Sequence, residues 1–492
     1  IHCHGDTVGF LIKFKRRKVD GYSSYGRRVY SALSRGSMPA VHVTFTLKTL
    51  NKMKKYIARL VYGVLLLSMA SCQDYLEEKP LKDILVPSTL EDVRALLDNY
   101  PRLNFNSLAT FLMSDDWEIT SQKWNALNPW EQNAYLWQKD VFEPNQRSVD
   151  YNAIHMKIFY SHICMDILDK QENHSNPEFS YLKGEALALR GRALFELAEL
   201  FLPSPKSGLK DQIKIPVNLE SDINATLVRL GISEVMDMIK HDLEMAFILL
   251  PEKQIYKIRP DKAAVKAYLA RMYLYEENWE EAYSAAAYVV EHSEELLDYN
   301  ELDASLAYPF TLFNKETVFY SITSSYSVTA SPETFINAEL YQLYGENDRR
   351  KDLFFRLDNG GNPLYKGSLT GNLELFTGIS LPEIYLTAAE GAIRAGNVEE
   401  GVAYLNQLGS NRYVDFVEWE NLSAEEALEL VLLERRKEQV FRGTRWLDMK
   451  RLWYLRPGPE VEREINGEVY TLASEEQYIW EVPPYEIELE GR

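Results

Sequence analysis

Four of the nine tryptophans of this 492-residue chain fall within twenty-one residues of one another, at Trp117, Trp124, Trp130 and Trp137. Polar side chains flank them: Asp115, Asp116, Asn125, Asn128, Glu131 and Gln132. An indole ring offers a flat apolar face, and nearby amides and carboxylates fix the orientation of a bound polar group. The stretch is therefore a candidate site for a ligand with one flat apolar side and several hydroxyl groups, with Asp116 and Asn128 as polar contacts. The alternative is that the indoles pack loops against helices, and we expect about half of them in the core.

A second group of aromatic residues lies in another irregular part of the chain. Four tyrosines belong to it: Tyr326, Tyr341, Tyr344 and Tyr365. Of these, Tyr341 and Tyr344 complete the candidate site. Two segments, roughly 103–147 with Asn and Pro and 300–380 with Gly, Pro and Asn, are predicted to form loops with a few short strands. Long loops in a compact domain are usually functional, so we expect binding on these two segments.

The signal for catalysis is weak. Glycoside hydrolases need two carboxylates at a set separation, and the adjacent Asp115 and Asp116 would serve only if their side chains diverged. No His-Glu-x-x-His motif, phosphate-binding loop or Gly-x-Ser-x-Gly elbow occurs in the sequence. His155 and His162 lie on one helical stripe, which is more typical of a packed pair than of metal ligands. The sequence favours a protein that is not an enzyme and needs no metal to fold.

Helices must position these loops, and several are clearly marked. Ser88 and Glu91 form a capping-box pattern ahead of an apolar face that Pro101 ends. Apolar residues at helical spacing predict helices over most of 148–202 and over about 233–250. These segments are expected to pack as helix pairs.

A self-match at a separation of 119 residues gives the clearest internal order. Asn278, Glu280, Glu281 and Ala282 correspond to Asn397, Glu399, Glu400 and Gly401. Small residues recur around both segments at the spacing of a tetratricopeptide repeat, in which two antiparallel helices approach closely. The sequence therefore predicts two such helix pairs within a larger, mainly α-helical body.

Cys72 has the position of the lipidated cysteine in a bacterial lipoprotein signal. Basic residues at 54, 55 and 59 are followed by an apolar core over 60–67 and by small residues over 68–71. The core is too short to span a bilayer, which takes about 20 residues. Residues 53–71 are therefore predicted to be a removable signal peptide, and Cys72 the acylated first residue of the mature chain. A buried core helix and a secretory signal without lipid are the alternatives.

The segments around this signal complete the predicted organisation. Residues 1–52 would hold the signal far from the N-terminus, where it must act, so they are interpreted as non-native upstream translation. A basic N-terminal arm is the alternative. Residues 72–87 carry two prolines and are predicted to be a lipidated tether, and residues 88–492 the folded body.

The part of the chain after Cys72 is strongly acidic. It holds 41 Lys and Arg against 71 Asp and Glu, a formal net charge of −30. Such a body gains nothing from counterion release, so nucleic acid is not an expected partner, and anionic lipid would repel it. Attachment to a membrane would come from acyl chains on Cys72. Cys164 lies in an apolar run and is expected to be a buried thiol.

The C-terminal part of the chain carries a dense set of residues at fixed spacing: Glu434, Arg435, Arg436, Lys437, Glu438, Phe441, Gly443, Arg445, Trp446, Asp448, Lys450, Arg451, Val482, Pro483, Pro484, Glu486 and Ile487. This pattern resembles the C-terminal signature of the SusD/RagB family, and the resemblance extends over most of 72–492. Two departures are Thr444, where the family often has His, and Gly491-Arg492 in place of an Asn-Pro ending.

The resemblance implies a lipid-anchored protein at the outer surface of the cell outer membrane. Members of the family sit on a SusC-like TonB-dependent transporter, capture oligosaccharide or in some cases peptide, and deliver it without cleaving it. Their fold is a superhelix of tetratricopeptide-like helix pairs with a loop-rich ligand face, and some members carry structural calcium. The expected ligand is therefore a glycan, with no cofactor. A peptide-binding tetratricopeptide-type lipoprotein and a glycoside hydrolase are the alternatives.

The C-terminal signature also contains seven basic residues, at positions 435, 436, 437, 442, 445, 450 and 451. Glu434, Glu438 and Asp448 lie at spacings that allow helical ion pairs. A solvated face of ion pairs is therefore preferred to a phosphate site. Trp279 and Trp446 are assigned to structure.

Overall fold

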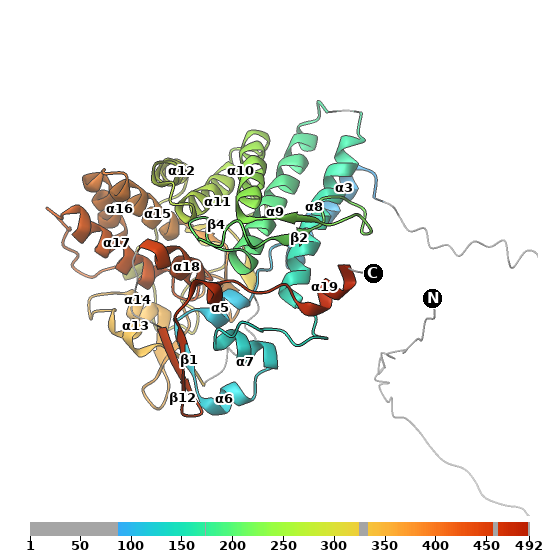
Figure 1. Ribbon diagram of the computed structural model, residues 1–492. Coiled ribbons are helices and arrows are strands. Elements are labelled where there is room, and N and C mark those ends of the chain that lie inside the picture. The colour runs from blue at the N-terminus through green and yellow to red at the C-terminus, as the bar shows by residue number, and fades with distance from the viewer. Residues whose placement is uncertain (1–86, 173, 324–332, 456–460, 491–492) are drawn as a thin grey trace, which may run out of the picture. The chain divides into compact units, whose positions relative to one another are not determined.

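The computed structural model describes residues 87–172, 174–323, 333–455 and 461–490. Predictions about the signal peptide, Cys72 and the tether lie outside these residues. The described residues form a layer of antiparallel helices and, on one side of it, a layer of loops with short strands (Figure 1). No helix in this part of the chain has the length and apolar character needed to cross a membrane.

Long helices packed one against the next build the helical layer. They are α8 (Val149–Asp169), α9 (Pro177–Phe201), α10 (Ile232–Leu249), α11 (Lys262–Tyr275), α12 (Trp279–Glu291), α15 (Leu381–Arg394), α16 (Val398–Ser410) and α17 (Ala424–Glu438). Each packs against the next in this order up to α16, and α17 packs against both α15 and α16. The predicted mainly α fold of tetratricopeptide-like helix pairs is confirmed. Cys164 is buried in α8, as predicted.

The first described helix, α3 (Leu90–Leu97), packs against α8 and α9. Its capping box lies one residue beyond the predicted one. The Thr89 hydroxyl accepts the Asp92 backbone N–H at 3.1 Å, and the Asp92 carboxylate accepts the N–H groups of Thr89 and Ser88 at 2.9 and 2.8 Å. Asp92 binds two backbone donors in this register, so the predicted pairing of Ser88 with Glu91 is wrong.

The two predicted repeats are the pairs α11–α12 and α15–α16, and glycine sets how closely they approach. A Cβ added to Gly391 of α15 would lie 2.9 Å from the backbone N of Tyr283 in α12. A Cβ on Gly401 of α16 would lie 2.5 Å from Cγ1 of Ile393 in α15. Both positions therefore require glycine for the observed helix spacing.

Short elements occupy the rest of the chain. The helices are α4 (Tyr100–Leu103), α5 (Ala109–Met113), α6 (Ser121–Asn125), α7 (Pro129–Tyr135), α13 (Ala338–Gln342), α14 (Arg350–Phe354), α18 (Arg445–Leu455) and α19 (Pro484–Glu490), with 3-10 turns at Tyr299–Glu301 and Glu475–Tyr478. The antiparallel strand pairs are β1 (Trp117–Ile119) with β6 (Thr334–Ile336), β2 (Ile215–Val217) with β3 (Val228–Leu230), β4 (Thr317–Phe319) with β10 (Ile379–Ser380), β5 (Ile322–Thr323) with β9 (Leu375–Phe376), β7 (Phe355–Leu357) with β8 (Pro363–Tyr365), and β11 (Val461–Ile465) with β12 (Glu468–Leu472).

The β1–β6 ladder joins the two loop segments that the sequence indicates for binding. Trp117 lies opposite Ile336, and Ile119 lies opposite Thr334. Just beyond the ladder, the side-chain amide of Asn337 donates to the Glu118 carboxylate at 2.7 Å. Segments more than two hundred residues apart in the sequence therefore lie side by side in one layer.

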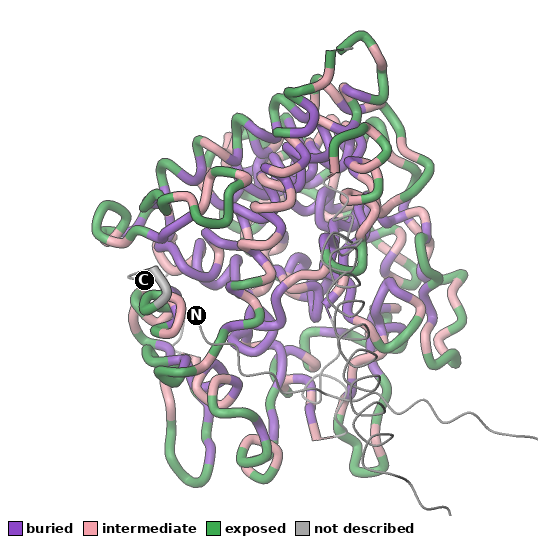
Figure 2. The backbone as a smooth tube through the Cα atoms, turned by 90° about the vertical axis from the view of Figure 1, so that its right-hand side faces the viewer, coloured by how far each residue is buried: buried purple, intermediate pink, exposed green. Residues whose placement is uncertain are grey.

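Most basic residues of the C-terminal signature are buried. Five of them are at most 3% exposed: Arg435, Lys437, Arg442, Lys450 and Arg451. Buried backbone runs through the interior of the described body, and exposed residues concentrate in peripheral loops and turns (Figure 2). Glu434 and Asp448 form the expected helical pairs, with Lys437 and Arg451, whereas Glu438 pairs with the distant Arg350 and Arg412. The predicted solvated face is wrong, because α17 and α18 pack inside the molecule.

Three charged residues of this buried region are bonded together. The guanidinium of Arg451 donates to Glu390 with both Nη atoms at 2.8 Å, and its Nε donates to Asp448 at 2.8 Å. Burial would raise the pKa of Asp448, but Arg435 and Arg451 hold it down to about 2.

Lys450 Nζ donates to the backbone oxygens of Glu199, at 2.9 Å, and Leu202, at the C-terminal end of α9.

Replacing Arg451 with Met should destabilise the fold strongly. The change leaves Glu390 buried without its bidentate partner, and breaking a buried pair in this way costs about 3–5 kcal/mol. The free energy of unfolding, measured in urea by circular dichroism, tests this. Lys139→Met is the matched control, because Lys139 and Glu481 pair at 3.2 Å in solvent and should contribute less than about 1 kcal/mol. Equal losses in the two variants would contradict the assignment.

Candidate ligand-binding face

Two indoles of the predicted site reach the surface from α6 and α7. Trp124 Nε1 donates to the backbone oxygen of Gln132 at 3.3 Å, and the Gln132 amide donates to the backbone oxygen of Trp124 at 2.9 Å. Trp124 and Trp130 are each half-buried, and Asn128 between them is exposed. The Glu131 carboxylate accepts both the backbone N–H of Asn128, at 2.9 Å, and its side-chain amide, at 2.6 Å. The two helices therefore hold these side chains in fixed positions at the protein surface.

The other two indoles of that stretch lie in the core. Trp117 and Trp137 are 1% and 2% exposed, and their ring N–H groups donate to the backbone oxygens of Phe111 and Met113 at 2.6 and 2.9 Å. The guanidinium of Arg463 lies 4.3 Å from the ring centroid of Trp137. Both rings are covered by protein, so their assignment to ligand contact is corrected.

Asp116 and Tyr344 are also buried and are removed from the predicted site. The Asp116 carboxylate pairs with Arg436 and accepts the backbone N–H of Phe441 at 3.3 Å. The Tyr344 hydroxyl donates to the backbone oxygen of Lys437 at 2.7 Å. Both side chains thus bond to the C-terminal signature and not to a ligand.

Tyr341 keeps a partly open position on α13. Its ring packs edge-on against Phe355, with centroids 5.4 Å apart, and is half-buried. The residues of the predicted site that a ligand can reach are therefore Trp124, Asn128, Trp130 and Tyr341. Whether they bind one remains a prediction.

The adjacent carboxylates Asp115 and Asp116 are bonded to arginines. Arg445 donates to both oxygens of Asp115, at 2.6 and 2.7 Å. Although burial would raise it, the neighbouring Arg436 and Arg445 hold the pKa of Asp115 well below its usual range. A carboxyl group held ionised in this way is a poor proton donor. Among the described residues, no group of three or more His, Cys, Asp or Glu is placed to hold a metal ion.

The second loop segment contributes a hollow of about 130 Å³. Its wall contains Tyr308, Arg356, Lys366, Asn372 and Leu373. The Lys366 ammonium donates to the backbone oxygen of Ala304 at 2.5 Å and so fixes one side of the hollow. Thr334 also lines it and lies opposite Ile119 in the β1–β6 ladder, which connects the hollow to the segment that carries α6.

Sequence reasoning missed the residues of this hollow. Tyr308 and Arg356 lie in segments without a motif, and only the general expectation of binding over 300–380 covered them. The hollow forms because the β7–β8 hairpin and the loop after it fold toward Tyr308, which local sequence patterns do not reveal. The alternating polar residues Arg356, Lys366, Ser368 and Asn372 were the available signal.

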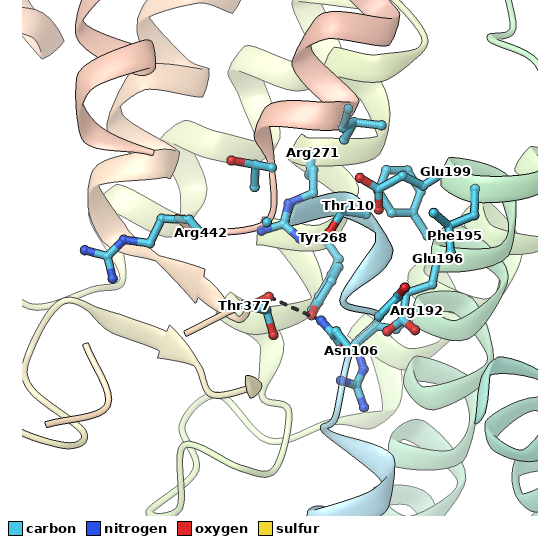
Figure 3. A pocket seen from close by; sticks show the side chains of 15 residues that line it. Asn106, Thr110, Arg192, Phe195, Glu196, Glu199, Tyr268, Arg271, Thr377 and Arg442 are labelled. Atoms are coloured by element: carbon cyan, nitrogen blue, oxygen red, sulfur yellow. Dashed lines mark hydrogen bonds between the residues drawn. The ribbon is translucent and has the colours of Figure 1, made fainter. Parts of the chain in front are cut away.

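A smaller internal pocket lies between α9, α11 and the C-terminal signature (Figure 3). Its volume of about 40 Å³ suits a few water molecules and is too small for a sugar ring. Asn106 donates to the backbone oxygen of Thr377 at 3.3 Å, while Asn106 Oδ1, Thr377 Oγ1 and Arg192 Nε have no hydrogen-bond partner among the residues that the structure describes. Burial raises the pKa of Glu199 in its wall to about 8, against the opposing charges of Arg271 and Lys450.

Comparison with known protein families identifies both halves of the described body. Residues 74–274 match a family described as starch-binding and associating with the outer membrane, and residues 302–483 match the family described as the SusD family. The chain belongs to the SusD family. It matches none of the curated proteins.

Solved structures with the same fold include other SusD-like proteins. A SusD superfamily protein from Bacteroides fragilis aligns with a TM-score of 0.66 at 20% identity, covering 82% of this chain and 98% of that one. A SusD-like carbohydrate binding protein from Bacteroides vulgatus aligns with a TM-score of 0.61 at 18% identity, covering 82% and 96%. These likenesses show that this chain has the fold of the SusD family's carbohydrate-binding proteins.

The Glu199 carboxyl should make stability fall as the pH rises. Its pKa is about 8 in the folded protein and about 4.3 in an unfolded chain, so between these values the folded state holds a proton that the unfolded state releases. Glu199→Gln cannot ionise and should raise the melting temperature more at pH 8 than at pH 5.

Thermal melts at both pH values measure this difference. Glu143→Gln is the control, because Glu143 is exposed and its replacement should give the same small shift at pH 5 and pH 8. A Glu199→Gln effect that is equal at the two pH values would show that this carboxyl is already ionised in the folded protein.

Proposed function

We propose that the protein binds a glycan on its loop layer and delivers it to a SusC-like TonB-dependent transporter, without cleaving it. The family model that matches residues 74–274 describes starch binding in association with the outer membrane. One of the similar structures is named a carbohydrate binding protein. The binding face would be the loop layer, as the position of its aromatic and polar side chains suggests.

The observation that carries this proposal is the pair of half-buried indoles, Trp124 and Trp130, with the exposed Asn128 between them. A pyranose presents an apolar face and hydroxyl groups, so it needs a flat ring to stack on and a short polar group to bond to. The rings are already held by α6 and α7, which means that little side-chain entropy is lost when a sugar binds. Tyr341 would extend the same face.

The bonding of Asp115 and Asp116 to arginines supports binding without hydrolysis. Asp115 and Asp116, the pair that the sequence offers for glycoside cleavage, bond to Arg436 and Arg445. A general acid must hold its proton near neutral pH, and Asp115 is held in its ionised form. Hydrolysis is the weaker alternative, and peptide binding by the helix pairs is the other.

The proposed location follows from the N-terminal segments. Residues 1–52 would be non-native upstream translation and 53–71 the signal peptide. Acyl chains on Cys72 would insert in outer-membrane lipid, because two or more chains give stable attachment. Residues 72–87 would tether the folded body, 88–492, at the cell exterior above the transporter.

Removing either indole should weaken glycan binding. Trp124→Ala and Trp130→Ala should each reduce the affinity for the bound polysaccharide about thirtyfold, since truncating a tryptophan hot spot commonly costs about 2 kcal/mol. Affinity electrophoresis across a panel of polysaccharides identifies the ligand and measures the loss. Tyr181→Ala is the control, because Tyr181 is an exposed aromatic residue on α9, in the helical layer.

The same panel separates the alternatives. Unchanged retention of both tryptophan variants would remove this site, and retention on no polysaccharide at all would favour a peptide ligand. Incubation with each retained polysaccharide should release no reducing sugar. Measurable turnover would replace the binding function with hydrolysis.

Mass spectrometry of the protein from a native membrane tests the anchor. The mature chain should begin at Cys72 and carry acyl chains, because the signal peptidase cleaves before the lipidated cysteine. Cys72→Ser should release the protein from the membrane. An intact Ile1 or Met53 at the N-terminus of the mature protein would contradict the proposed processing.

A further inference from the structure

Two exposed aromatic rings that play no part in the site described above lie around Tyr320. The Tyr320 backbone N–H donates to the backbone oxygen of Lys257 at 2.8 Å, which places Tyr256 beside it. The ring of Phe313 packs edge-on against the ring of Tyr320, with centroids 4.9 Å apart. Tyr256 is 57% exposed and Phe313 is 45% exposed. Two loops that are distant in the sequence thus meet at Tyr320, and each carries an exposed ring.

The backbone of Phe313 is strained. Its φ angle is 55°, in the left-handed region that bulky residues rarely adopt. Strain of this kind is often found at functional sites. The Phe313 ring packs edge-on against Tyr320, and nearly half of the Phe313 side chain remains exposed to water. The strained backbone therefore holds an apolar ring at the surface.

The ring of Tyr256 has a fixed neighbour. The guanidinium of Arg259 lies 5.3 Å from its centroid. Asp98 holds this guanidinium through both of its carboxylate oxygens, at 3.0 and 2.8 Å from Nε and Nη2. The cation is thus positioned before any ligand arrives, and more than half of the tyrosine side chain remains open to solvent.

Two lysines lie directly beside these rings in the sequence and share one small hollow. Lys257 follows Tyr256, and Lys315 lies two residues after Phe313; both line a hollow of about 30 Å³. Neither ammonium group forms an ion pair or a hydrogen bond within the residues that the structure describes. Two positive charges therefore remain without a protein partner next to two exposed rings.

The carboxylates of the same hollow are already engaged. Glu252 pairs with Lys262, and Glu294 lies 3.7 Å from Lys253. The Asp261 carboxylate accepts the backbone N–H of Ala264, in the first turn of α11, at 2.9 Å, and that of Gln254, in the preceding loop, at 3.2 Å. The hollow is lined by three lysines and three carboxylates, and Lys257 and Lys315 are the charged groups among the described residues that remain free to bond to a ligand.

We propose that Tyr256, Lys257, Phe313 and Lys315 form an aromatic–lysine surface that binds an acidic sugar unit, carrying a carboxylate or a sulfate. The proposal rests on the proposed function in that the ligand is a glycan. The rings supply apolar contact for the sugar, and the lysines attract its anionic group. Repulsion from the rest of the acidic protein is screened beyond about 8 Å at physiological salt, so local charge decides binding.

Affinity electrophoresis in polygalacturonate and in chondroitin sulfate, with neutral pullulan and galactan beside them, tests the ligand class. The wild-type protein should be retarded by at least one acidic polysaccharide, and more weakly as sodium chloride is raised. Lys257→Gln combined with Lys315→Gln should weaken that interaction about tenfold, which corresponds to about 1.4 kcal/mol. Lys206→Gln combined with Lys210→Gln removes the same charge elsewhere and should change nothing.

Two substitutions of Phe313 separate ring contact from folding. Phe313→Ala and Phe313→Gly should both weaken retention by the acidic polysaccharide. Glycine adopts positive φ without strain, so the glycine variant should melt at a temperature no lower than that of the alanine variant. If the Phe313 ring serves only the fold, both variants would be retained by the acidic polysaccharide as strongly as the wild type.

The outcomes distinguish this inference from the proposed function. Retention by neutral polysaccharides alone, or equal retention of the wild type and the lysine double variant, would overturn the acidic site and leave glycan binding in place. Retention by no polysaccharide would overturn both. Loss of acidic binding on changing Trp124 but not the two lysines would place the acidic unit at the loop face instead.

Discussion

The buried cations of residues 435–451 constrain the rest of the structure. An arginine or lysine taken out of water must meet carboxylates or carbonyl oxygens at hydrogen-bond distance, and each partner here lies on a different part of the chain. Arg451 binds Glu390 of the second repeat, Lys450 binds the end of α9, and Arg445 binds Asp115 of the tryptophan segment. One short segment thereby fixes the loop layer against the helical layer. The half-buried indoles of α6 and α7 depend on this constraint, because Asp115 lies two residues before β1, the strand that leads into α6.

The helical layer could be predicted from the sequence because its signals are local. Apolar spacing and the repeated asparagine-glutamate turn each act within a few residues, and the helices follow them, whereas Pro101 lies at the start of α4 and not at the end of α3. The capping of α3 was displaced by one residue because Thr89 and Asp92 offer the same chemistry one position later. A local pattern can contain two equivalent registers, and only the backbone geometry chooses between them.

The candidate site was less predictable, because exposure depends on distant partners. Trp117 and Trp124 have similar neighbours in the sequence, yet Trp117 lies on a strand covered by Arg463 and Tyr135, whereas Trp124 lies on a short helix at the surface. The basic residues of the C-terminal signature were expected in solvent for the same reason. Ion-pair spacing is local, but burial is decided by which surfaces α17 and α18 pack against. The hollow beside Tyr308 depends on how the β7–β8 hairpin folds toward Tyr308, and the polar residues of its wall were its available local signal.

The ion pairs and hydrogen bonds of residues 435–451 also determine the order in which parts of the chain can fold. The ribosome makes the tryptophan segment more than three hundred residues before it makes the arginines that hold it. Until those arginines are synthesised, Asp115 and Asp116 have no counter-charges, and the tryptophan rings that follow them in the sequence are not held in fixed positions. The helix pairs can assemble as they emerge, but the loop layer must wait for the end of synthesis. A nascent or truncated molecule would thus have the helical layer without an ordered loop layer, so the positions of Trp124 and Trp130 depend on the last part of the chain.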